Sequence, residues 1–326
     1  MASRDPAESA QQTLAGLGEF AVIARLVAGR EQPGVVALGP GDDAAVVAAP
    51  DGRIVVSTDM LVEGRHFRLD WSTPHDIGRK AIAQNAADIE AMGARATAFV
   101  VAFGAPGDTA TTAALQLADG MWDEAHKFGA GVVGGDMVSA PQWVISVTVL
   151  GDLAGRAPVR RDGARPGDTV AVAGELGRSA AGYALWLRGI REGTHDLGSL
   201  RRRHLTPEPP YGQGRVAADA GATAMTDVSD GLLGDLGHIA QASGCVIDLS
   251  AGTLAADVDA VRTAADAVGA DPRDWVLGGG EDHALAATFG GAPPDGWRVI
   301  GRVLDGSPQV LVDGVTWAGN PGWQSY

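Results

Sequence analysis

Apolar positions in the first 150 residues follow two different spacings. Phe20, Ile23, Leu26 and Val27 recur at the spacing of one helix face, whereas short β-branched runs between such segments are typical of strands. The pattern predicts helices over 19–28, 74–92 and 109–128, strands over 54–57, 97–103 and 143–150, and short apolar runs at 35–38, 44–48 and 132–133.

The same alternation returns after a basic, proline-containing stretch at 151–168. Beyond it, the pattern predicts strands over 169–173, 245–249, 284–289 and 297–303, helices over 179–188 and 229–242, and a polar, proline-rich connection over 192–214. We therefore expect two domains, 1–150 and 151–326, with residues 1–16 disordered. Strands and helices are mixed in both halves, which indicates an α+β or α/β fold.

Composition narrows the possible partners. The chain of 326 residues has 25 Lys and Arg against 40 Asp and Glu, a net charge of −15. This balance argues against nucleic acid, whose phosphates are held by basic patches. The apolar runs are far shorter than the ~20 residues of a membrane span. The single cysteine, Cys245, cannot form an intrachain disulfide, and no secretory leader is visible, so we expect a cytoplasmic protein.

Six segments share one design, in which an apolar run leads to Gly or another small residue and then to Asp or Glu. They are 39–43, 57–59, 85–88, 134–136, 227–231 and 278–282. Each segment alone is also explained as a turn or a helix cap. Mg²⁺, however, prefers oxygen ligands, and adjacent acids such as Asp42 and Asp43 repel each other without a cation. We expect the segments outside predicted helices to lie at strand ends and to bind divalent cations and phosphate.

Asp88 differs from the other acids because it falls inside the predicted helix 74–92. Ala81, Gln84, Asn85 and Asp88 share one face of that helix at i, i+3, i+4 and i+7. This face either points to solvent or reaches a metal cluster, and the spacing leaves both interpretations open.

Several common catalytic motifs do not occur. The chain has no G-x-x-x-x-G-K-[ST] loop and two lysines in all, Lys80 and Lys127. It also lacks a dinucleotide fingerprint, a Cys/His cluster for zinc and a G-x-S-x-G elbow. Any phosphate chemistry would therefore depend on cations that the acidic segments hold.

Taken in order, the motifs resemble those of the thiamine-monophosphate kinase family. The resemblance extends from about residue 17 to residue 326 and rests on 18–25, 41–45, 57–67, 80–94, 134–136, Asp168, 227–239 and 279–282. It implies a two-domain fold like that of aminoimidazole ribotide synthetase, with an N-terminal α/β domain whose strands join across a homodimer and a C-terminal α+β domain. It also implies ATP and thiamine monophosphate as substrates and several Mg²⁺ ions.

The resemblance assigns roles residue by residue. The metal ligands would be Asp43, Ser57, Thr58, Asp59, Asp88, Asp136, Asp227 and Asp230, with Asp59, Asp136 and Asp230 also expected to be catalytic. Gly135, Arg160 and Ser229 would lie near ATP, and His66, Glu281 and Trp323 would hold thiamine monophosphate. No role follows for Asp42 or Asp282. His283 replaces the aromatic residue usual in the family, and the usual Arg after Asp136 is missing.

The expected reaction is direct, in-line phosphoryl transfer assisted by Mg²⁺, which yields thiamine diphosphate. Two alternatives stay open. One is another ATP-dependent enzyme of the superfamily, such as aminoimidazole ribotide synthetase. The other is a divalent-cation-binding module without turnover. Selenophosphate synthetase is disfavoured because no reactive cysteine lies near the N-terminus.

Overall fold

The computed structural model describes residues 12–40, 44–191 and 195–322. The chain forms two compact units: residues 1–85 with 96–152, and residues 86–95 with 153–326. The expected boundary at 150/151 lies close to this division, although the stretch 86–95 groups with the second unit. A short helix, α2 (Leu14–Leu17), capped by Thr13, begins inside the stretch 1–16 that was expected to be disordered.

The first unit is built on a four-stranded sheet in the order β3-β6-β4-β5. Its strands are β3 (Val55–Val62), β4 (Arg95–Ala105), β5 (Gly131–Ser139) and β6 (Val144–Asp152); β1 (Val36–Leu38) and β2 (Val46–Val47) form a separate pair. β3 pairs antiparallel with β6, whereas β4 and β5 are parallel. This order leaves β3 and β5 as the two edge strands.

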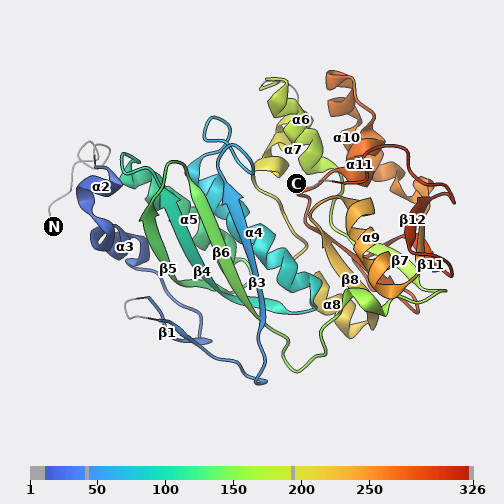
Figure 1. Cartoon of the computed structure of the whole chain (residues 1–326), viewed down its shortest axis with the longest axis horizontal. Helices are drawn as coiled ribbons and strands as arrows, with labels where there is room; N and C mark the ends of the chain where they lie inside the picture. The colour runs from blue at the N-terminus through green and yellow to red at the C-terminus, as the bar shows by residue number, and fades with distance from the viewer. Residues whose placement is uncertain (1–11, 41–43, 192–194, 323–326) are drawn as a thin grey trace. The chain divides into compact units, whose positions relative to one another are not determined.

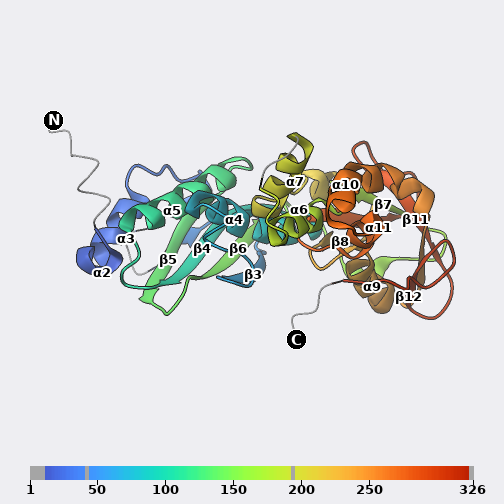
Figure 2. The same cartoon turned by 90° about the horizontal axis from the view of Figure 1, so that it is seen from above.

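Helices cover one face of this sheet (Figures 1 and 2). They are α3 (Glu19–Val27), α4 (Pro74–Ala91) and α5 (Thr111–His126). A Cβ on Gly78 would lie 2.0 Å from the Leu117 carbonyl oxygen, and one on Gly120 would lie 2.0 Å from that of His75. These two glycines therefore let α4 and α5 approach each other backbone to backbone.

The second unit contains a six-stranded sheet in the order β12-β9-β11-β7-β10-β8, antiparallel except for β9 with β12. The strands are β7 (Thr169–Ala173), β8 (Ala222–Val228), β9 (Val246–Leu249), β10 (Ala284–Phe289), β11 (Arg298–Leu304) and β12 (Gln309–Val312). The helices are α6 (Arg178–Leu187), α7 (His195–Leu205), α8 (Gln213–Asp219), α9 (Leu232–Ser243), α10 (Ala255–Val268) and α11 (Pro272–Gly278), with short 3-10 turns at Arg161–Gly163 and Ala251–Leu254.

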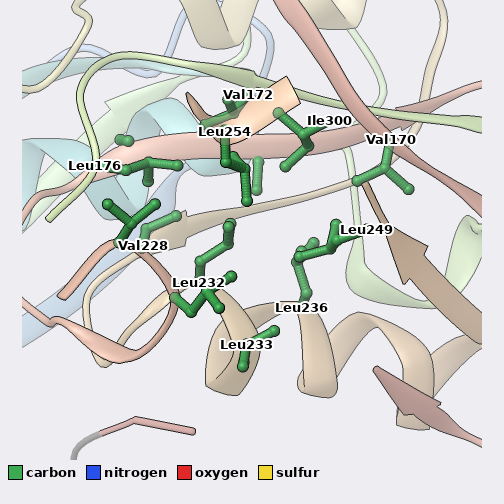
Figure 3. Close-up of a cluster of buried hydrophobic side chains, with 14 of the residues drawn as sticks. Val170, Val172, Leu176, Val228, Leu232, Leu233, Leu236, Leu249, Leu254 and Ile300 are labelled. Carbon is green, nitrogen blue, oxygen red and sulfur yellow. The ribbon is translucent and has the colours of Figure 1, made fainter. Parts of the chain in front are cut away.

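Two hydrophobic cores lie on opposite faces of this second sheet. Val170 and Val172 of β7 belong to the larger core, whereas Ala171 and Ala173 belong to the smaller one, as the two-residue repeat of a strand requires. Figure 3 shows leucines of α9, among them Leu236, facing the strand side chains of the larger core. The sheet is thus buried on both faces, and the loops at its edge carry the polar residues.

The sequence-based elements agree with most strands and helices, but one prediction was wrong. The segment 192–214, expected to be a connection, contains α7. The basic run Arg201–Arg203 and the next residue, His204, lie in the last turns of this helix, and His204 is buried. The sequence pattern also did not predict α8, β8, α10, α11 and β12. No helix among the described residues is both long and apolar enough to cross a bilayer.

Candidate active site

In the first unit, Asp59 lies in the middle of the edge strand β3 rather than at a strand end as expected. Gln84 Nε2 of α4 donates to Asp59 Oδ2 at 3.2 Å, and the Asp59 amide donates to Asn85 Oδ1 at 3.2 Å. Asn85 is fully buried, and its Nδ2 donates to the Ala81 carbonyl. The polar face of α4 therefore meets Asp59 at these two positions instead of pointing to solvent.

The neighbouring hydroxyl, Thr58, is occupied within the sheet. Its Oγ1 donates to the Val147 carbonyl oxygen at 3.0 Å, and Thr148 Oγ1 lies 3.2 Å away as a donor to it. Thr58 Oγ1 thus has one lone pair left for a metal ion beside these two hydrogen bonds. Ser57, two residues before Asp59, is partly buried on the same face of β3 as Asp59.

Asp136 lies in β5, the opposite edge strand, and also falls inside its strand. The side chain is exposed, and Oδ1 accepts from the Met137 amide at 2.9 Å. A Cβ on Gly135 would lie 1.9 Å from the Val101 carbonyl oxygen, so this glycine is required by the pairing of β4 with β5. Three strand spacings, about 14 Å, separate the edge strands β3 and β5 that carry Asp59 and Asp136.

In the second unit, the two acidic loops are joined through their backbones. The Glu281 amide donates to the Ser229 carbonyl oxygen at 2.7 Å, and the His283 amide donates to that of Val228 at 2.9 Å. Glu281 and His283 adopt left-handed φ values of 63° and 52°, which are costly for residues with side chains. A Cβ on Gly280 would lie 2.7 Å from the Ser229 carbonyl oxygen, so the close approach needs glycine.

Carboxylates gather beside these loops. Asp227, near the end of β8, is 3% exposed, and His283 Nδ1 donates to its Oδ2 at 3.2 Å. Burial alone would lower the pKa of His283, but the hydrogen bond and charge of Asp227 raise it overall. Asp88 adds to this rise, which places the Asp88 carboxylate within electrostatic reach of His283.

Asp230 and Asp235 lie in an environment that disfavours negative charge. Burial and then the charge of Asp227 raise the pKa of Asp230. The same two causes raise the pKa of Asp235 to about 7, although it accepts hydrogen bonds from the Asp230 and Gly231 amides. Carboxylates that lie this close together repel one another. A hard cation such as Mg²⁺, which prefers oxygen ligands, would stabilise them.

Glu281 contacts a buried histidine of α7. Its Oε2 lies 3.4 Å from His204 Nδ1, which is also 3.2 Å from Ser179 Oγ. The next residue, Asp282, receives the Gly177 and Ser179 amides at the start of α6, at 2.5 and 2.9 Å. Asp282 thus acts as a cap for α6, a role that the sequence alone did not reveal.

The basic stretch before β7 contains two adjacent arginines, Arg160 and Arg161, either of which could contact ATP. Arg160, expected near ATP, is exposed and paired with Asp162. The next residue, Arg161, is close enough to Asp230 for its positive charge to offset part of the rise in the pKa of Asp230. The family resemblance assigned the place near ATP to Arg160 alone, although adjacent arginines give no local signal that separates them. A cavity of about 410 Å³ lies beside this stretch and is lined by Arg156, Arg160, Thr223 and their neighbours.

The structure brings the expected residues together only in part. Asp227, Ser229, Asp230 and Glu281 meet within the second unit. Asp42, Asp43 and Trp323 lie outside the described residues, which end at Gly322. Among residues 12–40, 44–191 and 195–322, no group of three or more His, Cys, Asp or Glu side chains is arranged to hold a metal ion. The proposed metal set therefore stays a prediction.

Comparisons with known proteins agree with this fold. Residues 41–153 match the model of AIR synthase related protein, N-terminal domain, and residues 165–274 match that of AIR synthase related protein, C-terminal domain. A crystal structure of thiamine-monophosphate kinase from Stenotrophomonas maltophilia superimposes with a TM-score of 0.76 at 33% identity, and covers 91% of this chain and 96% of its own. The fold and the acidic loops thus define an AIR synthase-related protein.

The sequence relatives are more specific. The thiamine-monophosphate kinase of Mycobacterium tuberculosis is 68% identical over 314 residues, covering 96% of this chain and 93% of the relative. A structure described as AaThiL complexed with AMPPCP and TMP has a TM-score of 0.77 at 31% identity, with 97% and 99% of the two chains covered. The chain belongs to the thiamine-monophosphate kinase family.

Proposed function

We propose that this protein transfers the γ-phosphoryl group of ATP to thiamine monophosphate and so produces thiamine diphosphate. The observation that carries the proposal is the 68% identity to a thiamine-monophosphate kinase over 96% of the chain. The related structure complexed with AMPPCP, an ATP analogue, and with TMP supports the same pair of substrates. The reaction would take place in the cytoplasm, as the sequence predicts.

The chemistry needs charge neutralisation more than a general base. The second pKa of a phosphate monoester is about 6, so the attacking oxygen is largely ionised at pH 7. Two unit charges 4 Å apart repel by about 4 kcal/mol at an effective dielectric constant of 20. Bound Mg²⁺ would supply the positive charge that the chain's two lysines cannot. Phosphoryl transfer then depends on positioning, and inversion at a chiral γ-phosphorus is the expected result for direct transfer.

The described carboxylates could bind such ions singly or in pairs. Mg²⁺ in phosphoryl-transfer sites uses one or two carboxylates and completes its shell with phosphates and water. Asp227 with Asp230 would hold one ion, since each has a carboxylate beside the same loop. Asp59 and Asp136 would serve different ions within one unit, because their strands β3 and β5 lie at opposite edges of the sheet, about 14 Å apart. Asp43, Ser57, Thr58 and Asp88 complete the proposed set.

The same reasoning assigns the substrate contacts. Gly135, Ser229 and Arg160 are proposed to lie near ATP, and Arg161 joins them because of its position near Asp230. His66, Glu281 and Trp323 are proposed to hold thiamine monophosphate. Of these, His66 and Glu281 each have a defined hydrogen-bonding environment, through Val62 and His204 respectively.

We also propose that the protein acts as a homodimer joined through its first unit. The face of the sheet opposite α4 and α5 exposes Val56, Met60 and Val138 at 61%, 54% and 59%. Apolar side chains gathered on an open sheet face mark an interaction surface. The edge strands β3 and β5 each have an unpaired side within the unit, which a second copy can cover.

A coupled ADP assay tests the activity. ADP release should require thiamine monophosphate, ATP and Mg²⁺, and excess EDTA should stop it. Formylglycinamidine ribotide, the acceptor of a ribotide synthetase, should give no release; release with that compound alone would refute the proposal. No release with either acceptor would favour a cation-binding module.

The site assignment has its own test, Asp136→Ala. We expect kcat to fall at least 100-fold, because a proposed metal ligand is lost. The fold should be unaffected, since Asp136 is exposed and its described hydrogen bond goes to the adjacent amide. Asp108→Ala, another exposed acid of the same unit, is the control and should keep parental activity. Near-normal turnover in Asp136→Ala would remove Asp136 from the proposed site.

A further inference from the structure

His66 sits on a turn whose hydrogen bonds use nearly all of its polar groups. Its amide donates to the Val62 carbonyl oxygen at 3.0 Å, and the Val62 amide donates back to His66 Nδ1 at 3.0 Å. Its carbonyl oxygen accepts from Lys80 Nζ at 2.9 Å. Within the described chain, Nε2 is the one polar atom of His66 without a partner in these hydrogen bonds.

The direction of the Val62 bond fixes the ring's tautomer. A backbone amide can only donate, so Nδ1 must accept and carries no hydrogen. In the neutral ring the hydrogen therefore resides on Nε2. His66 is exposed, so Nε2 is available as a hydrogen-bond donor to a ligand. Protonation of Nδ1 would break the Val62 bond.

Lys80 makes this turn unusual. Lys80 belongs to α4 and is 2% exposed. Burying a charged ammonium group costs free energy. An apolar side chain of similar length would avoid that cost. The carbonyl of His66 is a defined partner of the ammonium, so the buried charge is used to hold the residue that carries the ring.

The rest of the turn is held by Trp143, the residue directly before β6. The Glu63 amide donates to the Trp143 carbonyl oxygen at 2.9 Å, and the Trp143 amide donates to Glu63 Oε2 at 3.0 Å. Phe67, directly after His66, is buried. A ring held on such a fixed turn loses little freedom when a ligand binds.

We propose that Lys80 is a positioning residue that, with the Val62 amide, holds His66 as a neutral donor whose Nε2–H binds a hydrogen-bond acceptor of thiamine monophosphate. The proposal rests on the proposed function for its ligand, but the tautomer and the role of Lys80 are properties of the free protein. The two ring nitrogens of His66 thus have different roles, and the buried Lys80 holds the residue that carries them.

Two substitutions separate the two ring nitrogens. In His66→Asn, Oδ1 can replace Nδ1 as the acceptor, but the distal donor is lost. In His66→Gln, the amide NH₂ can replace Nε2–H, but the Val62 partner is lost. The KM for thiamine monophosphate should rise roughly tenfold in His66→Asn, the effect of one lost hydrogen bond, and less than about threefold in His66→Gln. The reverse order, or equal effects, would overturn the donor assignment.

Lys80→Met tests the positioning role, with Lys127→Met as the matched control on the chain's other lysine, which pairs with Glu124. We expect Lys80→Met to raise the KM for thiamine monophosphate while kcat and the KM for ATP stay near parental values. A general loss of structure would instead lower kcat and change both KM values. If Lys80→Met does not fold, Lys80→Arg and the two His66 variants carry the same test.

Ring ¹⁵N spectra of histidine-labelled protein give a readout that needs no activity. The chain has 7 histidines, so the His66 signals are assigned by their loss in His66→Gln. At pH 8 the parent should show an unprotonated Nδ1 and a protonated Nε2, and Lys80→Met should show a mixture. A protonated Nδ1 in the parent would refute the tautomer. If ADP release fails while the tautomer is as expected, the proposed function falls and the Lys80–His66 geometry stands.

Discussion

At the scale of single residues, Asp282 shows how one carboxylate links the acidic loop to the helix that follows β7. It accepts the Gly177 and Ser179 amides at the start of α6, where the helix dipole also favours a negative charge. Burial nevertheless outweighs these interactions and raises the pKa of Asp282 from 3.8 to about 7. The folded protein therefore retains a proton there that the unfolded chain has lost.

This shift predicts a pH dependence of stability. Between about pH 4 and 7 the folded state binds the Asp282 proton more tightly than the unfolded state, so its contribution to stability is full at low pH and is lost as pH rises to 7. Asp282→Asn cannot ionise, so the urea midpoint of the parent should fall relative to that of the variant across this range. Asp295→Asn, on an exposed loop, should follow the parent. A constant difference between parent and Asp282→Asn would contradict the shift.

The sequence located the acidic loops more readily than the residues that surround them. The order of Gly, Ser and Asp residues identified the loops at 227–231 and 278–282, because each motif is contiguous. The partners of those loops come from distant segments: His204 contacts Glu281 from α7, and Arg161 acts on Asp230. Contacts between distant segments follow from the tertiary fold, which no local pattern contains.

At the scale of elements, the pair of helices α6 and α7 explains why 195–205 was missed. α7 carries many charged residues and few apolar ones, so the segment is polar overall and resembles a solvated connection. Tertiary packing stabilises this helix. Leu197 and Leu200 are buried in the larger core, and Gly182 of α6 lets the backbones of α6 and α7 lie in contact. The less polar segments α4 and α5 were predicted to within about two residues at each end.

This helix pair gives a matched test. A Cβ on Gly182 would lie 2.1 Å from the Leu200 carbonyl oxygen, so Gly182→Ala should destabilise the protein by roughly 1–3 kcal/mol. Gly198→Ala, inside α7, meets only the ends of arginine side chains at 3.7 Å or more and should stabilise by up to about 1 kcal/mol through helix propensity. Urea unfolding measures both. A destabilising Gly198→Ala would contradict a helix over 195–205.

At the scale of the whole molecule, the open sheet face of the first unit is where a second copy would bind. Val138 on β5 is 59% exposed. Val315, in the second unit, is 66% exposed and serves as a control position of similar exposure outside the proposed interface. A lysine at Val138 would place a charge in the proposed interface, where leaving it unpaired costs free energy. Val138→Lys should therefore elute at the monomer mass in light-scattering chromatography, whereas Val315→Lys and the parent should elute as dimers. A dimeric Val138→Lys, or a monomeric parent, would mean that this face has another partner.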